Sequence, residues 1–133
     1  MSGDLIYLAS PYTDNRPSMV EWRYKKNKRA LRELTGLGYT VFAPVVVGHQ
    51  LHKEGLDRDW AWWMQWSLVF LARSTRCFVL TLPGWENSKG VRAEVDYCVE
   101  HKIPVVGCDI LPDCIPTTGF DLLGVFGYKG LSW

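Results

Sequence analysis

Segments with the repeat of a β-strand alternate along this chain with segments that have the repeat of an α-helix, and this alternation limits the fold more than any other feature. The strand-like segments are short apolar runs at 4–9, 39–47, 76–82 and 103–108. The helix-like segments between them lie at 18–36, 56–74 and 90–102. Such alternation is typical of a parallel sheet with helices on both faces. We therefore predict an α/β domain with a parallel sheet of four to five strands.

The ends of these segments carry their own signals. The run at 76–82 is almost continuously apolar, as expected for a strand that is covered on both faces. Pro44 interrupts the second strand-like segment, so we expect that strand to end near it. Ser18 is a candidate N-cap for the first helix, and Gly36 or Gly38 is its expected stop.

The chain of 133 residues is large enough for one domain with its own core, so we predict a single domain over 1–133. The tail at 112–133 has no element pattern that we can assign. The N-terminal residues lack the basic and long apolar regions of a signal peptide, and we interpret them as a strand. The cysteines have no CxxC spacing, which favours a reduced, cytoplasmic protein; they are Cys77, Cys98, Cys108 and Cys114.

Charge and hydropathy exclude two classes of partner. Fifteen Lys and Arg against 14 Asp and Glu give a net charge of +1, so no overall field attracts polymeric nucleic acid or an acidic membrane. The basic run at 23–33 lies on a predicted helix beside an apolar stripe, and we interpret it as a solvated helix face. The longest apolar run, at 60–72, is too short to cross a bilayer.

Tryptophans occupy two faces of the segment at 60–72. Trp60 and Trp63 share one face and Trp62 and Trp66 lie on another, which leaves few positions for water. A helix that is apolar nearly all round is usually packed on both sides. The pattern predicts core or subunit-interface packing, with aromatic stacking on a base as the alternative.

Three loops leave the carboxyl ends of the predicted strands, at 10–13, 46–52 and 83–90. In open parallel sheets, ligands bind outside these strand ends, where the winding direction reverses. The three loops also hold most of the candidate polar groups of the chain. We therefore predict that they surround the functional site.

Glu94 is the first candidate for chemistry. It lies about 80° from the centre of the apolar stripe formed by Val91, Val95, Cys98 and Val99, so it borders the buried face of its helix. Near a helix start, free N–H groups and the helix dipole favour an anion. We expect an ionised carboxylate that faces the crevice and suits nucleophilic attack. The alternative is an ordinary first-turn Glu that assists helix initiation.

Ser88 precedes the same helix and has two interpretations. Its hydroxyl can cap the helix, or it can bind a phosphate together with Asn87 and the Gly90 N–H. No GxxxxGK[ST] motif is present, so this is not a nucleoside-triphosphate P-loop.

The first strand and its exit supply further candidates. Tyr7 lies within an apolar run and by itself suggests a core residue whose hydroxyl finds a partner. Ser10 and Tyr12 follow at the strand exit, where Pro11 stiffens the turn.

His49 and His52 have the i, i+3 spacing of a helical metal pair. The loop offers no third ligand or HExxH context, so we predict no metal. A substrate-contacting or a surface histidine is the preferred interpretation.

Three stretches together resemble the nucleoside 2-deoxyribosyltransferase-like superfamily. They are IYLASPYT, CFVLTLPGWENSKGVRAE and KIPVV, within residues 4–108. The likeness is greatest to small bacterial and phage members with the signature PGWxxSxGxxxE. The resemblance implies a flavodoxin-like or Rossmann-like three-layer fold, a homo-oligomer without a cofactor, and cleavage of the N-glycosidic bond of 2′-deoxynucleosides or their 5′-monophosphates.

The resemblance also implies roles for individual residues. Glu94 would attack the anomeric carbon to give a covalent deoxyribosyl-enzyme, with Tyr7 orienting it, and the acceptor would be water or a second base. Ser88 replaces the Asp of the transferases that act on free nucleosides, which favours a 5′-monophosphate. Ser10 is a further phosphate contact. The implied substrate-binding residues are Ser10, Pro11, Tyr12, His49, Ser67, Gly84, Trp85, Glu86, Asn87, Ser88 and Gly90.

One departure from the family pattern affects the expected activity. Ser67 stands where relatives usually carry an Asp that serves the base or leaving group, and a neutral Ser cannot act as a general acid near neutral pH. Either Glu86, His49 or Asp59 assists departure of the base, or the protein is a nucleotide or nucleotide-sugar sensor without efficient turnover. A third hypothesis is an interaction module whose tryptophan helix supports assembly.

Overall fold

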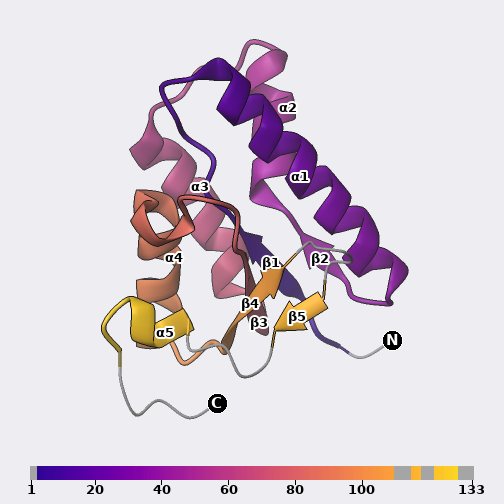
Figure 1. Cartoon of the computed structure of the whole chain (residues 1–133), viewed down its shortest axis with the longest axis vertical. Helices are drawn as coiled ribbons and strands as arrows, with labels where there is room; N and C mark the ends of the chain where they lie inside the picture. Colours follow the sequence, from indigo (N-terminus) through magenta and orange to yellow (C-terminus); the bar gives the residue numbers. More distant parts are fainter. Residues whose placement is uncertain (1–2, 110–114, 118–121, 129–133) are drawn as a thin grey trace.

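The described part of the chain forms a five-stranded sheet in the order β2-β1-β3-β4-β5 (Figure 1). The computed structural model describes residues 3–109, 115–117 and 122–128. The first four strands are parallel and β5 is antiparallel to β4. The strands are β1 (Ile6–Ala9), β2 (Val41–Phe42), β3 (Arg76–Leu80), β4 (Val105–Asp109) and β5 (Ile115–Thr117). The predicted parallel α/β sheet is confirmed, and β5 adds an edge strand in the tail that the sequence pattern left unassigned.

Helices cover both faces of this sheet. They are α1 (Pro17–Gly36), α2 (Pro44–Lys53), α3 (Trp60–Ala72), α4 (Lys89–Glu100) and α5 (Leu122–Val125), with a short 3₁₀ turn, η1 (Trp85–Asn87), before α4. Figure 1 shows α1 and α2 on one side and α3, α4 and α5 on the other. The three-layer prediction is confirmed.

The described residues form two hydrophobic cores, one on each face of the sheet, because side chains alternate between the faces along the central strands. In β1, Ile6 and Leu8 pack with Leu34 of α1 on one face, whereas Tyr7 and Ala9 point to the opposite face. The second core also contains buried side chains of α3 and α4; among them are Leu71, Val91, Val95 and Cys98. The stripe predicted on the α4 segment therefore faces the sheet, and the chain buries both sides of β1 and β3.

The region after β2 differs from the prediction. The strand has two residues, and Pro44 then begins α2 instead of ending a longer strand. Proline is favoured in the first helical turn because its fixed φ suits a helix and its missing N–H would have no partner there. The segment at 46–52 is therefore helical, and the loop predicted there was wrong.

Other helix boundaries follow local capping. Ser18 is not the N-cap of α1, because Pro17 already occupies the first helical turn and Arg16 takes the cap position. Gly38 has φ +101° after the helix end, as expected for a glycine stop. The helix predicted at 56–74 begins later, at Trp60, since the Asp59 carboxylate accepts the Trp62 N–H at 2.8 Å.

The tryptophan helix α3 is more exposed in this chain than we expected. Within α3, whose residues are all described, burial is confined to Ser67 and Leu71. Trp60 and Trp62 are each 37% exposed and Val69 is 53% exposed. The sheet covers one side of the helix, and no second layer formed by the described residues covers the other. The homo-oligomer predicted from this helix stays a prediction, as does the cytoplasmic location.

Two further observations concern the described residues alone. None of their helices combines the length and the apolar character that a bilayer span needs. The cysteines at 77, 98 and 108 are buried, as expected for small apolar side chains, and Cys114 lies outside the described residues.

Candidate active site

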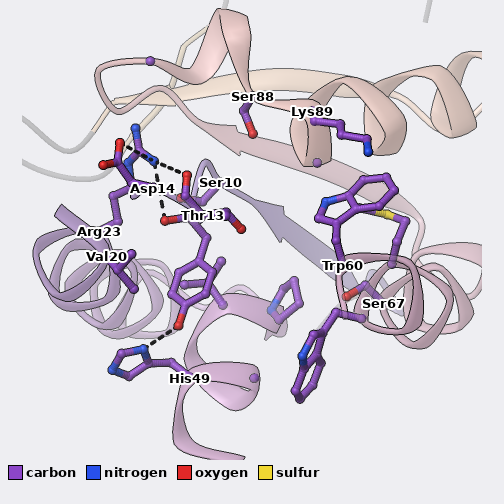
Figure 2. A pocket seen from close by; sticks show the side chains of 18 of the residues that line it. Ser10, Thr13, Asp14, Val20, Arg23, His49, Trp60, Ser67, Ser88 and Lys89 are labelled. Carbon is purple, nitrogen blue, oxygen red and sulfur yellow. Dashed lines mark hydrogen bonds and ion pairs between the residues drawn. The ribbon is translucent and has the colours of Figure 1, made fainter. Parts of the chain in front are cut away.

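A large pocket opens at the carboxyl ends of β1 and β3, where the strand order reverses direction. It encloses about 1130 Å³. Its walls come from the β1–α1 loop, α1, α2, α3, and the loop that leads from β3 into α4. Figure 2 shows Ser88 and Lys89 on one side of this space, His49 on another, and Trp60 with Ser67 on a third. The position agrees with the one predicted from the strand-exit loops.

Glu94 reaches this pocket from α4. Its side chain lines the pocket although it is only 5% exposed. The hydroxyl of Tyr7, a fully buried side chain on β1, donates a hydrogen bond to Oε2 of Glu94. A carboxyl held by a rigid strand residue at a pocket wall has one defined orientation, which is what a nucleophile requires.

The protonation of Glu94 differs from the prediction. Because α4 begins at Lys89, Glu94 lies beyond its first turn, where the free N–H groups are. Burial raises the pKa of the Glu94 carboxyl to about 8, and the hydrogen bond from Tyr7 opposes this rise only in part. Burial therefore favours the protonated form of Glu94 near neutral pH. Burial and the nearby Glu94 also raise the pKa of Tyr7 well above its usual range.

Ser88 caps α4 and also lines the pocket. Its Oγ accepts the Val91 N–H at 3.3 Å, which confirms the capping interpretation. A hydroxyl that accepts this bond still has its proton to donate to a ligand. Lys89 follows on the same rim, with its Nζ 4.1 Å from the centre of the Trp60 ring. The two predicted roles of Ser88 are therefore compatible with each other.

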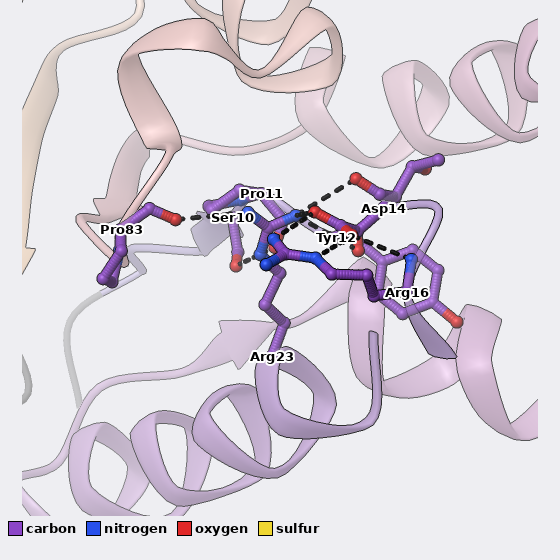
Figure 3. Close-up of polar contacts among 8 residues, drawn as sticks. Ser10, Pro11, Tyr12, Asp14, Arg16, Arg23 and Pro83 are labelled. Carbon is purple, nitrogen blue, oxygen red and sulfur yellow. Dashed lines mark hydrogen bonds and ion pairs between the residues drawn. The ribbon is translucent and has the colours of Figure 1, made fainter. Parts of the chain in front are cut away.

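Two buried polar residues of α1, Arg23 and Asn27, were missed by the sequence analysis. The guanidinium of Arg23 donates to the Thr13 carbonyl at 3.1 Å and to the Pro83 carbonyl at 3.2 Å; Figure 3 shows the bond to Pro83. Asn27 donates to Ser10 Oγ at 2.8 Å. The interpretation of 23–33 as a solvated face was wrong for these two residues. They lie at i and i+4 on the same stripe as the apolar core positions of α1, and that spacing was a usable signal.

Arg23 joins the two loops that carry the pocket, because Thr13 follows β1 and Pro83 follows β3. Ser10 belongs to the same network: its hydroxyl donates to the Pro11 carbonyl at 2.9 Å and accepts from Asn27. Its single proton is thus already engaged, so Ser10 supports the loop shape at the pocket wall.

Gly84 is required at its position for two reasons. Its φ of +93° is strained for any residue with a side chain, and a Cβ there would lie 2.8 Å from Nη2 of Arg23. We expect Gly84→Ala to lower the free energy of unfolding by about 2–3 kcal/mol, as backbone strain adds to disturbed hydrogen bonds. Urea denaturation measures this loss.

A matched control for Gly84→Ala is Gly38→Ala. Gly38 has φ +101°, and no described atom within 4 Å would meet its Cβ. Gly38→Ala therefore measures only the cost of a side chain at positive φ. We expect its loss of unfolding free energy to be smaller than that of Gly84→Ala by about 1 kcal/mol or more. Equal losses in the two variants would show that contact with Arg23 costs nothing.

His49 is buried, so the surface alternative for this residue was wrong. It lines the pocket from α2, and its Nδ1 lies 2.7 Å from the hydroxyl of Tyr12. Burial lowers the pKa of the His49 imidazole, and the Glu21 carboxylate opposes this effect. Within the described part of the chain, no three His, Cys, Asp or Glu side chains are grouped to hold a metal ion.

The pocket brings together most of the predicted site residues. Those that line it are Ser10, Tyr12, His49, Ser67, Gly84, Asn87, Ser88, Gly90 and Glu94. Trp85 lies elsewhere, because its ring packs edge-on against Phe126 in the core. Pro11 is buried and Glu86 is exposed, and neither of them lines the pocket.

Ser67 lines the pocket and is 9% exposed. Of the three groups predicted to assist departure of the base, Glu86, His49 and Asp59, all of them described, only His49 lines the same pocket. Asp59 caps α3, and Glu86 faces solvent.

Comparison with known proteins supports this reading of the fold. Residues 4–109 match the family described as "Domain of unknown function (DUF1937)". A solved structure of a 2-deoxyribosyltransferase from the psychrotolerant bacterium Bacillus psychrosaccharolyticus is similar with a TM-score of 0.56. It has 19% sequence identity, and the match covers 84% of this chain and 76% of that one. No curated protein sequence matches. At this identity the likeness shows a shared fold.

Proposed function

The chain belongs to the DUF1937 family, and from the pocket that it builds we propose that it cleaves or transfers the N-glycosidic bond of a 2′-deoxynucleoside 5′-monophosphate. The observation that carries the proposal is the Glu94 carboxyl, buried at the pocket wall and hydrogen-bonded by Tyr7. The similar structure of a 2-deoxyribosyltransferase supports the same reaction class.

In the proposed mechanism, Glu94 acts in its ionised form. A carboxylate oxygen attacks the anomeric carbon as the bond to the base breaks, which gives a covalent deoxyribosyl ester. Water or a second base then attacks the same carbon and releases Glu94. Tyr7 keeps one carboxyl oxygen fixed, so that the other points toward the sugar.

The rim of the pocket favours an anionic substrate. Ser88 has a hydroxyl proton free to donate, the first N–H groups of α4 lie beside it, and Lys89 adds a positive charge. We therefore infer that the 5′-phosphate binds at this rim, with the sugar beside Glu94. The apolar side chains of Trp60, Trp63 and Met64 give the base a surface to stack on.

Base release and its phosphate dependence test the proposal in one experiment. The protein is incubated with each 2′-deoxynucleoside 5′-monophosphate and the matching nucleoside, and free base is quantified by chromatography. We expect faster release from the monophosphate. Ser88→Asp should raise KM for the monophosphate by about 10- to 100-fold through like-charge repulsion and should favour the nucleoside.

The matched control is Ser88→Thr, which keeps the hydroxyl and the cap and should keep the wild-type preference. If every variant releases base equally fast from the monophosphate and from the nucleoside, the protein does not recognise the 5′-phosphate, and that part of the proposal is wrong. Absence of base release from every substrate would remove the reaction itself.

A nucleotide sensor is the second candidate. Two features favour it: Ser67 carries no charge, and burial raises the pKa of the Glu94 carboxyl to about 8, which disfavours the ionised form that attack requires. Calorimetric binding of a nucleotide at Ser88, weakened by Ser88→Asp and unaccompanied by base release, would support this function.

A further inference from the structure

A hydrogen-bonded series of three side chains, Tyr12, His49 and Glu21, leads from the pocket into the contact between α1 and α2. Nδ1 of His49 lies 2.7 Å from the hydroxyl of Tyr12, and Nε2 lies 3.1 Å from Oε2 of Glu21. Tyr12 and His49 line the pocket, whereas the Glu21 side chain is 38% exposed and does not line it. Figure 2 shows the bond between His49 and the tyrosine hydroxyl as a dashed line. The Tyr12 side chain is thus in contact with both the pocket and an imidazole.

Packing fixes the histidine in this arrangement. The Tyr24 ring stacks on His49 with centres 3.9 Å apart and planes 24° apart. Nζ of Lys53 lies 3.6 Å from the second oxygen of Glu21, so the carboxylate is also held. The titratable groups around His49 are therefore Glu21 and Tyr24 from α1, Tyr12 from the loop, and Lys53 and His52 from α2 itself. An imidazole with both nitrogens bonded has few ways to turn.

The protonation of His49 decides what Tyr12 offers to the pocket. Because the Glu21 carboxylate can only accept, the Nε2 atom of His49 carries a proton. In neutral His49, Nδ1 is then an acceptor and Tyr12 donates to it. In protonated His49, Nδ1–H donates to the Tyr12 oxygen, and the phenolic proton is free to point at a ligand. Burial raises the pKa of Tyr12, so its hydroxyl keeps a proton to donate.

The pocket needs such a donor. A departing base carries away the electron pair of the bond to the sugar, and protonation stabilises it. Ser67 occupies the position of the usual Asp and cannot serve, and Tyr12 faces the same space as Glu94.

Resting on the function proposed above, we propose that Tyr12 is the general acid that protonates the departing base and that His49 returns a proton to Tyr12. As the bond from the anomeric carbon to the base nitrogen breaks, its electron pair goes to that nitrogen, which takes the phenolic proton. Nδ1 of protonated His49 gives its proton to the Tyr12 oxygen and becomes neutral. When water attacks the covalent ester, its proton returns to His49 through Tyr12, and the electron pair of the ester bond returns to Glu94.

Glu21 is a positioning residue in this scheme. It sets the tautomer of His49 and raises the pKa of the imidazole against the effect of burial. Because the pKa of Glu94 lies above that of His49, base release from a natural substrate rises with pH until His49 loses its proton; in Glu21→Gln this rise should end at a lower pH than in the wild type. A purely structural role of Glu21 would leave the pH profile in place.

A pair of substrates separates the acid from the nucleophile. One is the natural 2′-deoxynucleoside 5′-monophosphate that the protein cleaves fastest. The other is N7-methyl-2′-deoxyguanosine 5′-monophosphate, whose base already carries a positive charge and leaves as a neutral molecule without a proton. Free base is measured in the first turnover, before water attacks the ester, with a blank that contains no protein.

We expect Tyr12→Phe to slow first-turnover release from the natural substrate by about 100-fold or more. Release from the methylated substrate should stay within about threefold of the wild type, which also shows that the variant is folded. The chain offers a matched control in a second tyrosine–histidine pair, Tyr97 and His101, stacked on α4 outside the pocket. Tyr97→Phe should release both bases at the wild-type rate.

Equal losses on both substrates in Tyr12→Phe, or no loss on either, would overturn the role of Tyr12 and leave Glu94 as the nucleophile. A wild type that cleaves the methylated substrate and no natural one would overturn it as well. Absence of cleavage of both substrates by the wild type would instead remove the proposed function.

Discussion

Glu94→Gln releases no detectable base from any 2′-deoxynucleoside 5′-monophosphate. We expect its rate of base release to be at least about 10⁴-fold below that of the wild type, which is the largest effect among our predictions. Gln has nearly the shape of Glu, and its amide oxygen can accept the hydrogen bond from Tyr7, so the pocket keeps its form. It cannot form the covalent ester. Chromatographic quantification of free base measures the loss.

Two further measurements sharpen this test. Glu100→Gln changes an exposed carboxylate on the same helix and should release base at the wild-type rate. Acid quenching of the wild type during turnover should leave a mass adduct of deoxyribose 5-phosphate that Glu94→Gln lacks. Base release at the wild-type rate in Glu94→Gln would exclude this residue as the nucleophile.

The sequence predicted the location of Glu94 better than its protonation. Its angle from the apolar stripe of α4 placed it at the border of the buried face, and the structure buries it there. Its ionisation was expected from the distance to the helix start, which is a local property. The pKa depends instead on how much water the sheet, α3 and α4 together exclude, and no local pattern contains that information.

Arg23 and α2 illustrate the same limit. The charge of Arg23 belongs to a basic run, but one of its partners, the Pro83 carbonyl, lies 60 positions away in the sequence. Pro44 is compatible both with a strand end and with a helix start, and the tertiary contact of α2 with α1 and β1 favours the helix. By contrast, the strands and the α4 stripe could be predicted because buried strands and amphipathic helices need a periodic sequence.

Glu94→Gln should also stabilise the protein, by an amount that depends on pH. Glu94 has a usual pKa of 4.5 when unfolded and a pKa of about 8 when folded. Between these values the native state holds a proton that the unfolded state has lost, so the free energy of unfolding falls as pH rises. Gln at position 94 has no such proton. The stability gained by Glu94→Gln should therefore grow by about 1.4 kcal/mol per pH unit from about pH 5 to about pH 7.5 and level off above pH 8.

Urea denaturation of the two proteins at pH 5, 6, 7 and 8 measures this difference; all other titrating groups are common to both and cancel. Glu100→Gln, on the exposed surface of the same helix, is the matched control and is measured at the same four pH values. Two results would contradict this expectation: a difference in unfolding free energy between Glu94→Gln and the wild type that does not change with pH, or a wild type that is more stable than Glu94→Gln at pH 8. Either would show that burial of the Glu94 carboxyl does not destabilise the protein. The expected slope would instead show that burial of the Glu94 carboxyl lowers the stability of the fold. Such a loss of stability is expected of a residue that is retained for its chemistry.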